Sequence, residues 1–332
     1  MNEPMRSAAA GIPAAPPTAG GRPEWLATAA IVAIAAAVIL VAVFVTPKFL
    51  TVDNIRAILR NAAIVGIVAV GMTPVTLSGN FVSLGITQSA MLAMVTFVAL
   101  LGAGWGQVPA VVVVLILLIA VGVLQGVIIA AGLNPVITTL AAGAIIFGVV
   151  SELSGGGIVR AGDNAVSWGA ATIAGVPLEV LIFLVFTALV TLVMQRTVAG
   201  RETILIGANR ATAEISGISF TRVTILAFAI FSIGLALAGI LNGAAFGQAT
   251  AVSFPGLTVD VIAAVLVGGT AIQGGRGSPI RSAGGAILIA VISNMMVLND
   301  FSTGGRLAVQ GGVVVAIVVL LDLLWKRGTR RT

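Results

Sequence analysis

Long apolar stretches, broken only by short polar turns, fill most of this 332-residue chain. The clearest is the segment 61–151, in which no Asp, Glu, Lys or Arg occurs. Because a helix needs about 20 apolar residues to cross a bilayer, this segment alone holds several crossings. Only helices and closed barrels satisfy the backbone inside lipid, and the apolar runs lack the alternation of a barrel strand. The pattern therefore predicts membrane-spanning helices.

Clusters of Gly, Pro, Asn and Ser divide the apolar residues into candidate spans. The expected spans are residues 25–45, 62–78, 86–103, 108–131, 136–150, 178–195, 223–243, 257–273, 283–299 and 307–325. The predicted fold is an all-α membrane protein, a polytopic bundle of about ten transmembrane helices. The first span is followed by Thr46-Pro47-Lys48, which offers no small-residue cleavage site, so we expect it to be retained.

The basic residues predict how the bundle is oriented. They gather in the segment 196–222 and in the tail 327–332, and loops rich in Lys and Arg stay in the cytoplasm. The number of spans before these segments places the N-terminal residues 1–24 in the cytoplasm as well. Those residues are rich in Ala, Pro and Gly, which predicts a disordered tail in front of a membrane domain at 25–326.

One basic segment does not follow this rule. Lys48, Arg56 and Arg60 would lie outside, offset only by Asp53. We expect residues 51–60 to form a short helix that lies along the outer membrane surface, separate from the span that follows it.

The composition narrows the chemistry that the chain can perform. It is 59% hydrophobic and 8% charged, and it contains no Cys, no His and no Tyr. Disulfides, thiolate or imidazole catalysis and metal sites built from His or Cys are therefore excluded. The net charge of +6 sits at span ends and in one loop, so topology explains it better than a nucleic acid partner. We expect neither an enzyme nor a cofactor or metal bound to this chain.

Two central segments interrupt the smooth apolar helices with glycine. Residues 66–85 and 268–285 both run from an apolar helix through a polar, glycine-rich turn into another apolar helix, about 195 residues apart. Broken helices at matching places in two halves of a chain indicate a translocation path. Glycines that only allow close helix packing would give the same pattern, and both interpretations stay open. Arg276 and Arg281 in the second turn are expected to fix its cytoplasmic side.

The segment 196–222 is the one long polar loop expected in the cytoplasm. Residues 209–216 have a short helical pattern, which Gly217 ends in a C-cap position. A short helix of mixed charge held between two spans suits docking onto a soluble partner. An ordinary solvated loop would have the same composition.

The same loop carries the motifs Gly200-Arg201, Gly207-Ala208-Asn209, Ala211 and Ser216-Gly217-Ile218. Further motifs are Asn134, Ile137, Thr139, Leu140, the segments 237–240, 260–270 and 274–277, and Asp322. Together they resemble the permease subunits of ribose-type bacterial ABC importers, the second carbohydrate uptake family, in the superfamily of branched-chain amino acid and monosaccharide permeases. The resemblance covers about 51–325 and is most specific from 200 to 280.

Two positions depart from the family pattern. The family has Gly-Ile-Asp-Leu-Ser-Val-Gly after its second span, whereas this chain keeps Ser83 and Gly85 but has Phe81 in place of the Asp. A family Arg-Gly in the fifth span appears here as Phe147-Gly148. Both departures concern the substrate more than the transporter class, because they lie away from the cytoplasmic loop.

The resemblance implies a division of labour between subunits. No Gly-x-x-x-x-Gly-Lys-Ser/Thr motif occurs, so ATP and Mg²⁺ are expected on a separate ATP-binding subunit. Two copies of the permease, a homodimer in membrane lipid, would form the pore, and an extracytoplasmic solute-binding protein would deliver the solute. The residues implied in coupling to the ATPase are Gly200, Arg201, Gly207, Asn209, Glu214 and Gly217.

The expected function is import of a monosaccharide, ribose- or xylose-like, or a similar neutral polar solute across the bacterial inner membrane, with both termini in the cytoplasm. The expected translocation path contains Asn80, Phe81, Ser83, Gln88, Asp260 and Thr270. An acid inside a span is a functional signal, although Asp260 could instead stabilise a helix N-terminus. Ser and Thr hydroxyls could likewise bond back to their own helices.

Other functions stay open at this point. The solute could be a nucleoside, an autoinducer or an amino acid. An ion-coupled secondary transporter would carry ionisable side chains inside its spans, and this chain offers almost none. A channel or a membrane scaffold without transport is the remaining class, and association with a soluble ATPase would separate it from an ABC permease.

Overall fold

The computed structural model of the chain describes residues 36–38, 40–164, 166, 168–302, 304–312 and 315. The predicted tails at 1–24 and 327–332, most of the first and last predicted spans, and Asp322 lie outside these residues.

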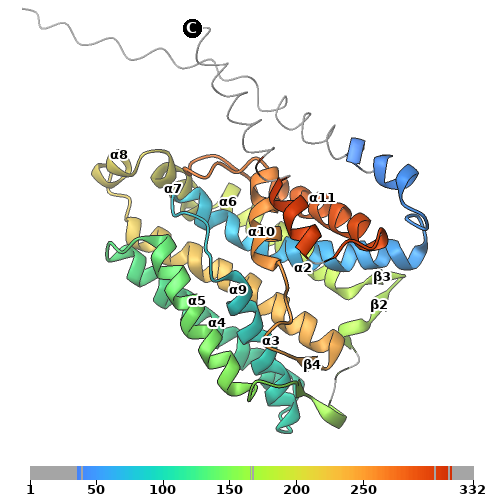
Figure 1. Ribbon diagram of the computed structural model, residues 1–332. Helices are drawn as coiled ribbons and strands as arrows, with labels where there is room; N and C mark the ends of the chain where they lie inside the picture. Colours follow the sequence, from blue (N-terminus) through green and yellow to red (C-terminus); the bar gives the residue numbers. More distant parts are fainter. Residues whose placement is uncertain are drawn as a thin grey trace, which may run out of the picture.

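Helices make up most of the described chain (Figure 1). They are α2 (Val52–Leu77), α3 (Ile86–Gly102), α4 (Gln107–Ala130), α5 (Pro135–Leu153), α6 (Leu178–Arg196), α7 (Val198–Ala208), α8 (Arg210–Ile215), α9 (Phe220–Phe246), α10 (Leu257–Val267) and α11 (Pro279–Leu298). The short 3₁₀ turns are η1 (Gly162–Asn164) and η2 (Trp168–Ala170). The strands β1 (Val159–Arg160), β2 (Thr172–Ile173), β3 (Val176–Pro177) and β4 (Gln248–Ala249) have two residues each. The prediction of an all-α class is confirmed.

Six helices in the described part of the chain are long and apolar enough to cross a membrane, namely α2, α4, α5, α6, α9 and α11. Shorter apolar helices are α3, α10 and the described residues of 36–45. The count of about ten spans stays a prediction, because the ends of the chain lie outside the described residues.

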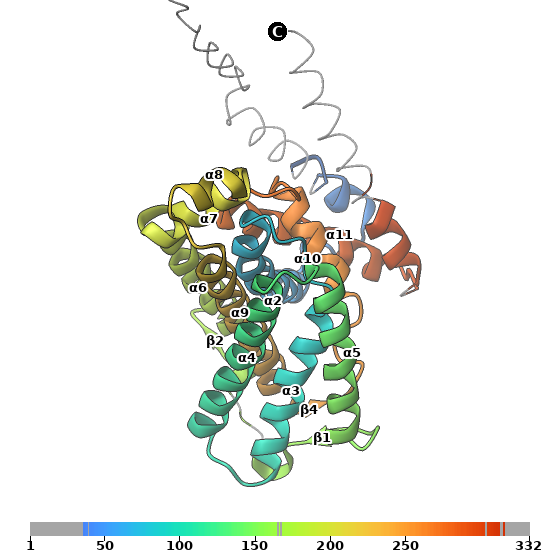
Figure 2. The same cartoon turned by 90° about the vertical axis from the view of Figure 1, so that its left-hand side faces the viewer.

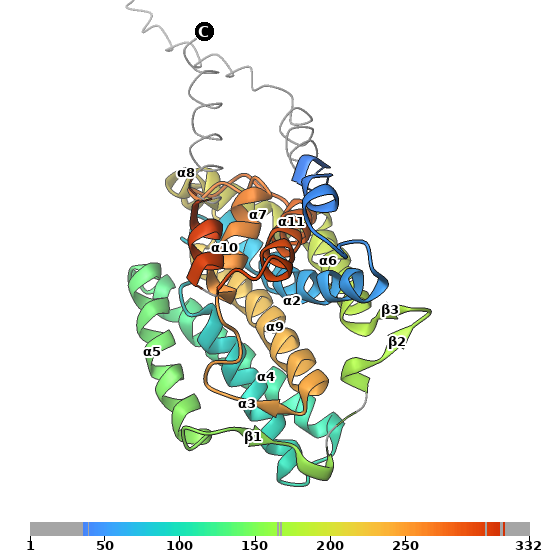
Figure 3. The same cartoon turned by 45° about the vertical axis from the view of Figure 1, so that its right-hand side comes forward.

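Helix α9 runs through the middle of the bundle and packs against α2, α3 and α4 (Figure 3). Its buried Phe228 and Phe231 meet edge to face, with ring centroids 6.5 Å apart. Glycines allow the neighbouring backbones to approach. A Cβ at Gly126 of α4 would lie 2.9 Å from Cα of Ile225, and one at Gly239 would lie 2.7 Å from the carbonyl oxygen of Ala90 in α3. Close approach at small residues is a main source of packing energy between membrane helices.

The bundle has two distinct ends (Figure 2). Helices α7 and α8 lie at one end. At the opposite end, β1 pairs antiparallel with β4 in the register Val159↔Ala249 and Arg160↔Gln248. A second hairpin, β2–β3, and the 3₁₀ turns complete this opposite end, where Trp168 packs edge to face against Phe97 at 6.4 Å.

The prediction of a separate surface helix at 51–60 is wrong. Residues 52–77 form one continuous helix of 26 residues, because neither Gly nor Pro interrupts the chain where a break was expected. Ile58 and Ala62 are buried in a cluster with Phe49 and with Ala290 of α11, which holds the early turns of α2 in the bundle. The charges of Arg56 and Arg60 are accommodated in ion pairs with Asp53 and with the buried Glu179, respectively.

The interruptions by glycine are shorter than predicted. Helix α2 continues through Gly66, Gly71 and Pro74, and only residues 78–85 are non-helical. A Cβ at Gly71 would lie 3.3 Å from Cα of Phe231, so this glycine serves helix packing.

The predicted span 257–273 is also wrong in its second half. Helix α10 has 11 residues and ends at Val267, and a loop from Gly268 to Ser278 leads into α11. Three glycines of this loop, Gly269, Gly274 and Gly275, have positive φ angles, which a continuing helix could not contain.

Candidate functional site

Helices α7 and α8 form a capped pair where the sequence predicted a polar loop. The side chain of Thr197 accepts a hydrogen bond from the N–H of Gly200 at 3.3 Å and so begins α7. Asn209 separates the helices, and its Oδ1 accepts from the N–H of Thr212 at 3.1 Å. Gly217, with φ +83°, ends α8. The predicted helix at 209–216 is confirmed, whereas α7 had not been predicted.

Arg210 ties α8 to the start of α9. Its guanidinium carbon lies 3.6 Å from the ring centroid of Phe220, a cation–π contact. Its Nε donates to Oε1 of Glu214 at 3.0 Å. Beneath this pair, Ile206, Ala213 and Phe220 belong to a small buried cluster with Val223. Glu214 is therefore part of a braced corner, while Arg201 of α7 is exposed.

Apolar side chains are exposed on this corner. Ile215 of α8 is 89% exposed, Leu205 of α7 is 52% exposed, and Ile204 is exposed as well. Exposed large apolar side chains that lie together are typical of a surface that contacts another protein or the membrane.

Gly200 marks the corner between α6 and α7. A Cβ at Gly200 would overlap the backbone of Met194, including its carbonyl oxygen. Because no backbone atom can rotate away, only glycine fits this corner.

Gly207 makes the closest contact between α7 and the rest of the bundle. A Cβ at this position would overlap the carbonyl oxygen of Leu77 at the end of α2 and would lie 2.5 Å from the amide nitrogen of Gly275. The N–H of Gly275 itself donates to the oxygen of Leu77 at 2.9 Å. The end of α7 therefore fits between the end of α2 and the loop 268–278.

The two predicted glycine-rich turns meet each other at this place. A Cβ at Gly274 would lie 2.7 Å from Cα of Gly79 and 3.1 Å from Cα of Gly207. Gly274 has φ +90° and Gly79 has φ +79°, a region open mainly to glycine. We name the set Gly79, Gly207, Gly274 and Gly275 the glycine junction. Each of these glycines could be found in the sequence, but their mutual contact could not.

The turn that follows the glycine junction holds three residues of the expected path. Asn80 is buried, and its Nδ2 donates to Oγ of Ser78 at 3.0 Å and to Oγ1 of Thr224 in α9 at 3.1 Å. Ser83 is buried, whereas Phe81 is 43% exposed. Asn80 therefore fastens the turn to α9, and Phe81 is the member of this group that faces outward.

Thr270 belongs to a chain of buried hydroxyl groups. Its Oγ1 lies 3.4 Å from Oγ of Ser282 in α11, and Oγ1 of Thr73 in α2 donates to Ser282 at 2.8 Å. All three residues are buried. These contacts hold the loop 268–278 against α2 and α11.

Helices α3 and α10 begin beside each other inside the bundle. Oγ1 of Thr87 lies 2.8 Å from Oγ1 of Thr258, the N–H of Thr258 donates to Thr87 at 3.2 Å, and the N–H of Thr87 donates to Thr258 at 3.3 Å. Each hydroxyl thus caps the first turn of the other helix. Thr258 was not predicted as a site residue, and its position two residues after Gly256 is the only indication in the sequence.

Gln88 and Asp260 follow these two threonines on their helices. Oε1 of Gln88 is buried without a hydrogen-bond partner among the described residues, and it lies near Gly143 of α5. Asp260 is 9% exposed, and its Oδ1 also has no hydrogen-bond partner in the described chain. Arg306 attracts this carboxylate electrostatically. The six expected path residues thus occupy three places: the turn, the hydroxyl chain and the starts of α3 and α10.

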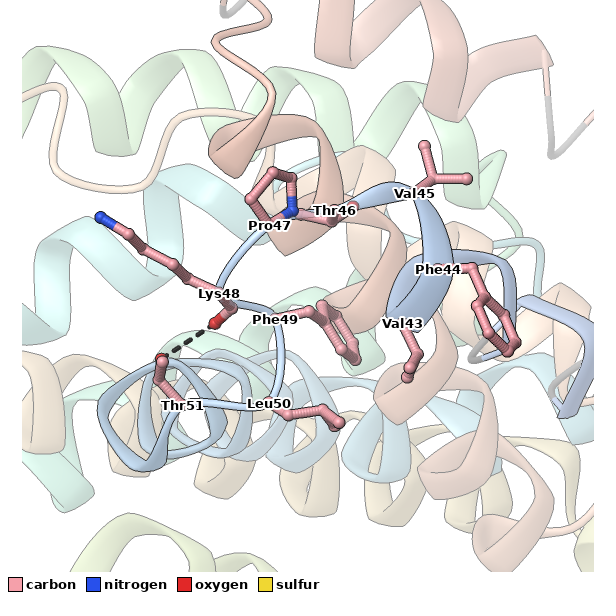
Figure 4. Close-up of a pocket in the computed structure, with 9 residues that line it drawn as sticks. All are labelled: Val43, Phe44, Val45, Thr46, Pro47, Lys48, Phe49, Leu50 and Thr51. Carbon is pink, nitrogen blue, oxygen red and sulfur yellow. Dashed lines mark hydrogen bonds between the residues drawn. The ribbon is translucent and has the colours of Figure 1, made fainter.

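One hollow in the described chain has a different location. Nine consecutive residues, Val43 to Thr51, curve around a space of about 540 Å³ before α2 (Figure 4). Thr51 closes the curve by donating from Oγ1 to the carbonyl oxygen of Lys48 at 2.9 Å. None of the predicted site residues lines this hollow. Among the described residues, no group of three His, Cys, Asp or Glu could hold a metal ion.

Residues 54–318 match the family model described as branched-chain amino acid transport system / permease component. The ribose import permease protein RbsC of Haemophilus influenzae is 30% identical over 303 residues, which cover 86% of this chain and 91% of that protein. RbsC of Escherichia coli K12 is 31% identical over 297 residues, with 86% and 91% covered. The D-allose transport system permease protein AlsC of the same strain is 28% identical over 294 residues, with 87% and 90% covered. The chain therefore belongs to this family of ABC transporter permeases, as the membrane component whose ATP hydrolysis takes place on a separate subunit.

Proposed function

We propose that the chain is the permease of an ATP-driven importer that moves a monosaccharide, ribose- or xylose-like, or a similar small neutral polar solute across the bacterial inner membrane. The observation that carries the proposal is the glycine junction, because it joins the corner α7–α8 to both glycine-rich turns. Two relatives support the solute class by their names, which are ribose import permease protein and D-allose transport system permease protein.

The ATP-binding subunit would dock on the corner α7–α8. Ile204, Leu205 and Ile215 offer exposed apolar contacts, and Arg201 lies exposed on the same helix as the first two. ATP binding would favour one of two conformations of the permease by its different affinity for them. The braced corner would pass that preference to the glycine junction.

A second copy of the permease would complete the pore, and a solute-binding protein would deliver solute at the end that carries β1–β4. The path would run past the turn with Asn80, Phe81 and Ser83, the starts of α3 and α10 with Gln88 and Asp260, and Thr270. A neutral solute suits this path, because residues 61–151 hold no charge that could balance a buried ionic group and Asp260 is the one ionisable residue among the expected path residues.

The proposal predicts which ligands the transport system accepts. In proteoliposomes with its ATPase and binding protein, the permease should take up labelled ribose, xylose or allose only when ATP is supplied. A ligand screen on the binding protein should show a higher unfolding temperature with the same sugar, since ligand binding stabilises the folded state. A response confined to amino acids or other charged ligands, with no response to sugars, would contradict the monosaccharide proposal.

The orientation gives a second prediction. We place the α7–α8 end and both termini in the cytoplasm, because Arg196, Arg201, Arg210 and Arg222 gather at that end. The native chain has no Cys, so single substitutions can be labelled without background. In sealed right-side-out vesicles an impermeant maleimide should label Asp163→Cys and leave Arg276→Cys unlabelled. The opposite labelling pattern would invert the proposed topology.

A further inference from the structure

We propose that Gly79 and Gly274 are positioning residues of the transport step, which make the starts of α3 and α10 follow α7 as one unit. The inference rests on the proposed function, because it needs an ATPase that acts on α7. Specific contacts inside the bundle would then transmit a movement of α7 to the starts of α3 and α10.

The first step is the contact between α7 and the two turns. Gly207 meets Leu77 and Gly275 through backbone atoms, and Gly274 meets Gly79 in the same way. Backbone atoms cannot change rotamer, so a movement of the end of α7 toward either turn must displace that turn. The hydrogen bond from the N–H of Gly275 to the oxygen of Leu77, 2.9 Å long, links the two turns directly.

The second step leads from each turn to a helix start. Residues 79–85 are not helical and lead directly into α3, so their displacement reaches Thr87. The loop 268–278 adjoins the other end of α10, an 11-residue helix about 16 Å long. A short rigid helix passes a movement of its end to its start, where Thr258 lies.

The third step joins these two routes. Thr87 and Thr258 exchange hydrogen bonds of 2.8, 3.2 and 3.3 Å, so the starts of α3 and α10 are fastened to each other. The contacts therefore form a closed ring that runs from Gly207 through Gly79 to Thr87, and back through Thr258 and Gly274. We name it the contact ring.

The contact ring explains why two turns about 195 residues apart both have a glycine where they touch, at Gly79 and Gly274. A side chain at either position would separate the turns and open the contact ring on the side of α7, so that α7 would no longer move the joined starts of α3 and α10. Gln88 comes directly after Thr87, and Asp260 comes two residues after Thr258. Each has a buried oxygen without a hydrogen-bond partner among the described residues. Movement of the ring would therefore relocate two acceptor groups that a solute hydroxyl can reach only when they are exposed.

The experiment measures solute taken up per ATP hydrolysed, in proteoliposomes that contain the ATPase and the binding protein. Gly274→Ala should bind the ATPase as the native permease does and retain most of its hydrolysis, while uptake per ATP falls at least tenfold. Gly284→Ala is the matched control, because a Cβ there meets no atom within 4 Å. It should leave the ratio unchanged.

The opposite side of the contact ring supplies a second test that adds no atoms to a crowded place. Thr87→Val and Thr258→Val keep the shape of the side chain but remove the shared hydrogen bonds. Each should lower uptake per ATP about as much as the double variant does, because either change opens the same link. Thr96→Val in α3 is the control, since the hydroxyl of Thr96 has no partner in the described chain.

Three outcomes are informative. A lowered ratio in the glycine and threonine variants, with hydrolysis retained, supports the contact ring. An unchanged ratio in folded Thr87→Val and Thr258→Val overturns it while the proposed function stands. No ATP-dependent uptake by the native permease would overturn the proposed function and this inference together.

Discussion

Replacing Gly207 with Ala is expected to abolish most transport. The new Cβ would overlap the carbonyl oxygen of Leu77 and would lie 2.5 Å from the amide nitrogen of Gly275. Neither atom belongs to a side chain, so the end of α7 must shift away from the glycine junction. Overpacking of this kind costs about 1–3 kcal/mol, which corresponds to a change of about fivefold to 150-fold in a conformational equilibrium. ATP-driven uptake in proteoliposomes should fall by about that factor.

Two measurements separate this effect from failure to fold. Gly207→Ala should still enter the membrane at native yield, because the apolar spans are unchanged. Gly148→Ala in α5 adds the same methyl group where no atom lies within 4 Å, and it should transport normally. Native uptake by Gly207→Ala would show that α7 does not act through the glycine junction.

Replacing Arg60 with Met is expected to lower the free energy of unfolding more than any other substitution of a charged residue away from the α7–α8 end. Nε of Arg60 lies 3.8 Å from Oε1 of Glu179, whose side chain is only 4% exposed. Removal of the arginine would leave this carboxylate buried without its cation. Loss of one partner of a fully buried pair typically costs about 3–5 kcal/mol, and the 41% exposure of the Arg60 side chain lowers this cost. The midpoint of thermal unfolding in detergent should fall clearly below that of the native protein.

Arg56→Met is the matched control. Its pair with Asp53 spans 3.9 Å between exposed side chains, and exposed pairs contribute about 0–1 kcal/mol. The double variant Arg60→Met, Glu179→Gln should recover much of the lost stability, because no charge then stays buried. Equal unfolding midpoints for Arg56→Met and Arg60→Met would refute a stabilising role for the buried pair.

Local hydropathy was sufficient to predict most of the helices. The expected spans 86–103, 108–131 and 178–195 correspond closely to α3, α4 and α6. Each apolar run of this length has one stable backbone form in lipid, so its identity does not depend on the neighbours. Capping residues also act locally, and Asn209 and Gly217 therefore predicted α8 within one residue of its bounds.

Predictions failed where a helix end depends on packing. The early turns of α2 pack into the bundle through the cluster of Ile58 and Ala62 with α11, and no local pattern reveals this contact. The loop after Val267 follows an apolar helix that hydropathy alone would extend. Its positive φ angles at Gly274 and Gly275 are compatible with the approach of Gly79 and Ala208.

The candidate site, too, was predicted from the sequence only in part. The loop motifs from Gly200 to Ile218 predicted the family of the chain, and the family model that matches residues 54–318 confirmed it. The expected path residues do not form one group, because Asn80 bonds to α9 while Thr270 bonds toward α11. The positions of these side chains depend on hydrogen bonds between distant segments, and such bonds cannot be predicted from the sequence.

The sequence by itself determined that this protein is a helical membrane permease, since apolar length, charge position and short motifs are properties of neighbouring residues. Only the tertiary structure decided that Gly79 touches Gly274 and that Thr87 meets Thr258. Such contacts depend on where whole helices lie. The partners in these pairs are about 195 and 170 residues apart in the sequence. The small residues that permit a close backbone approach can be found in the sequence, but their partners cannot.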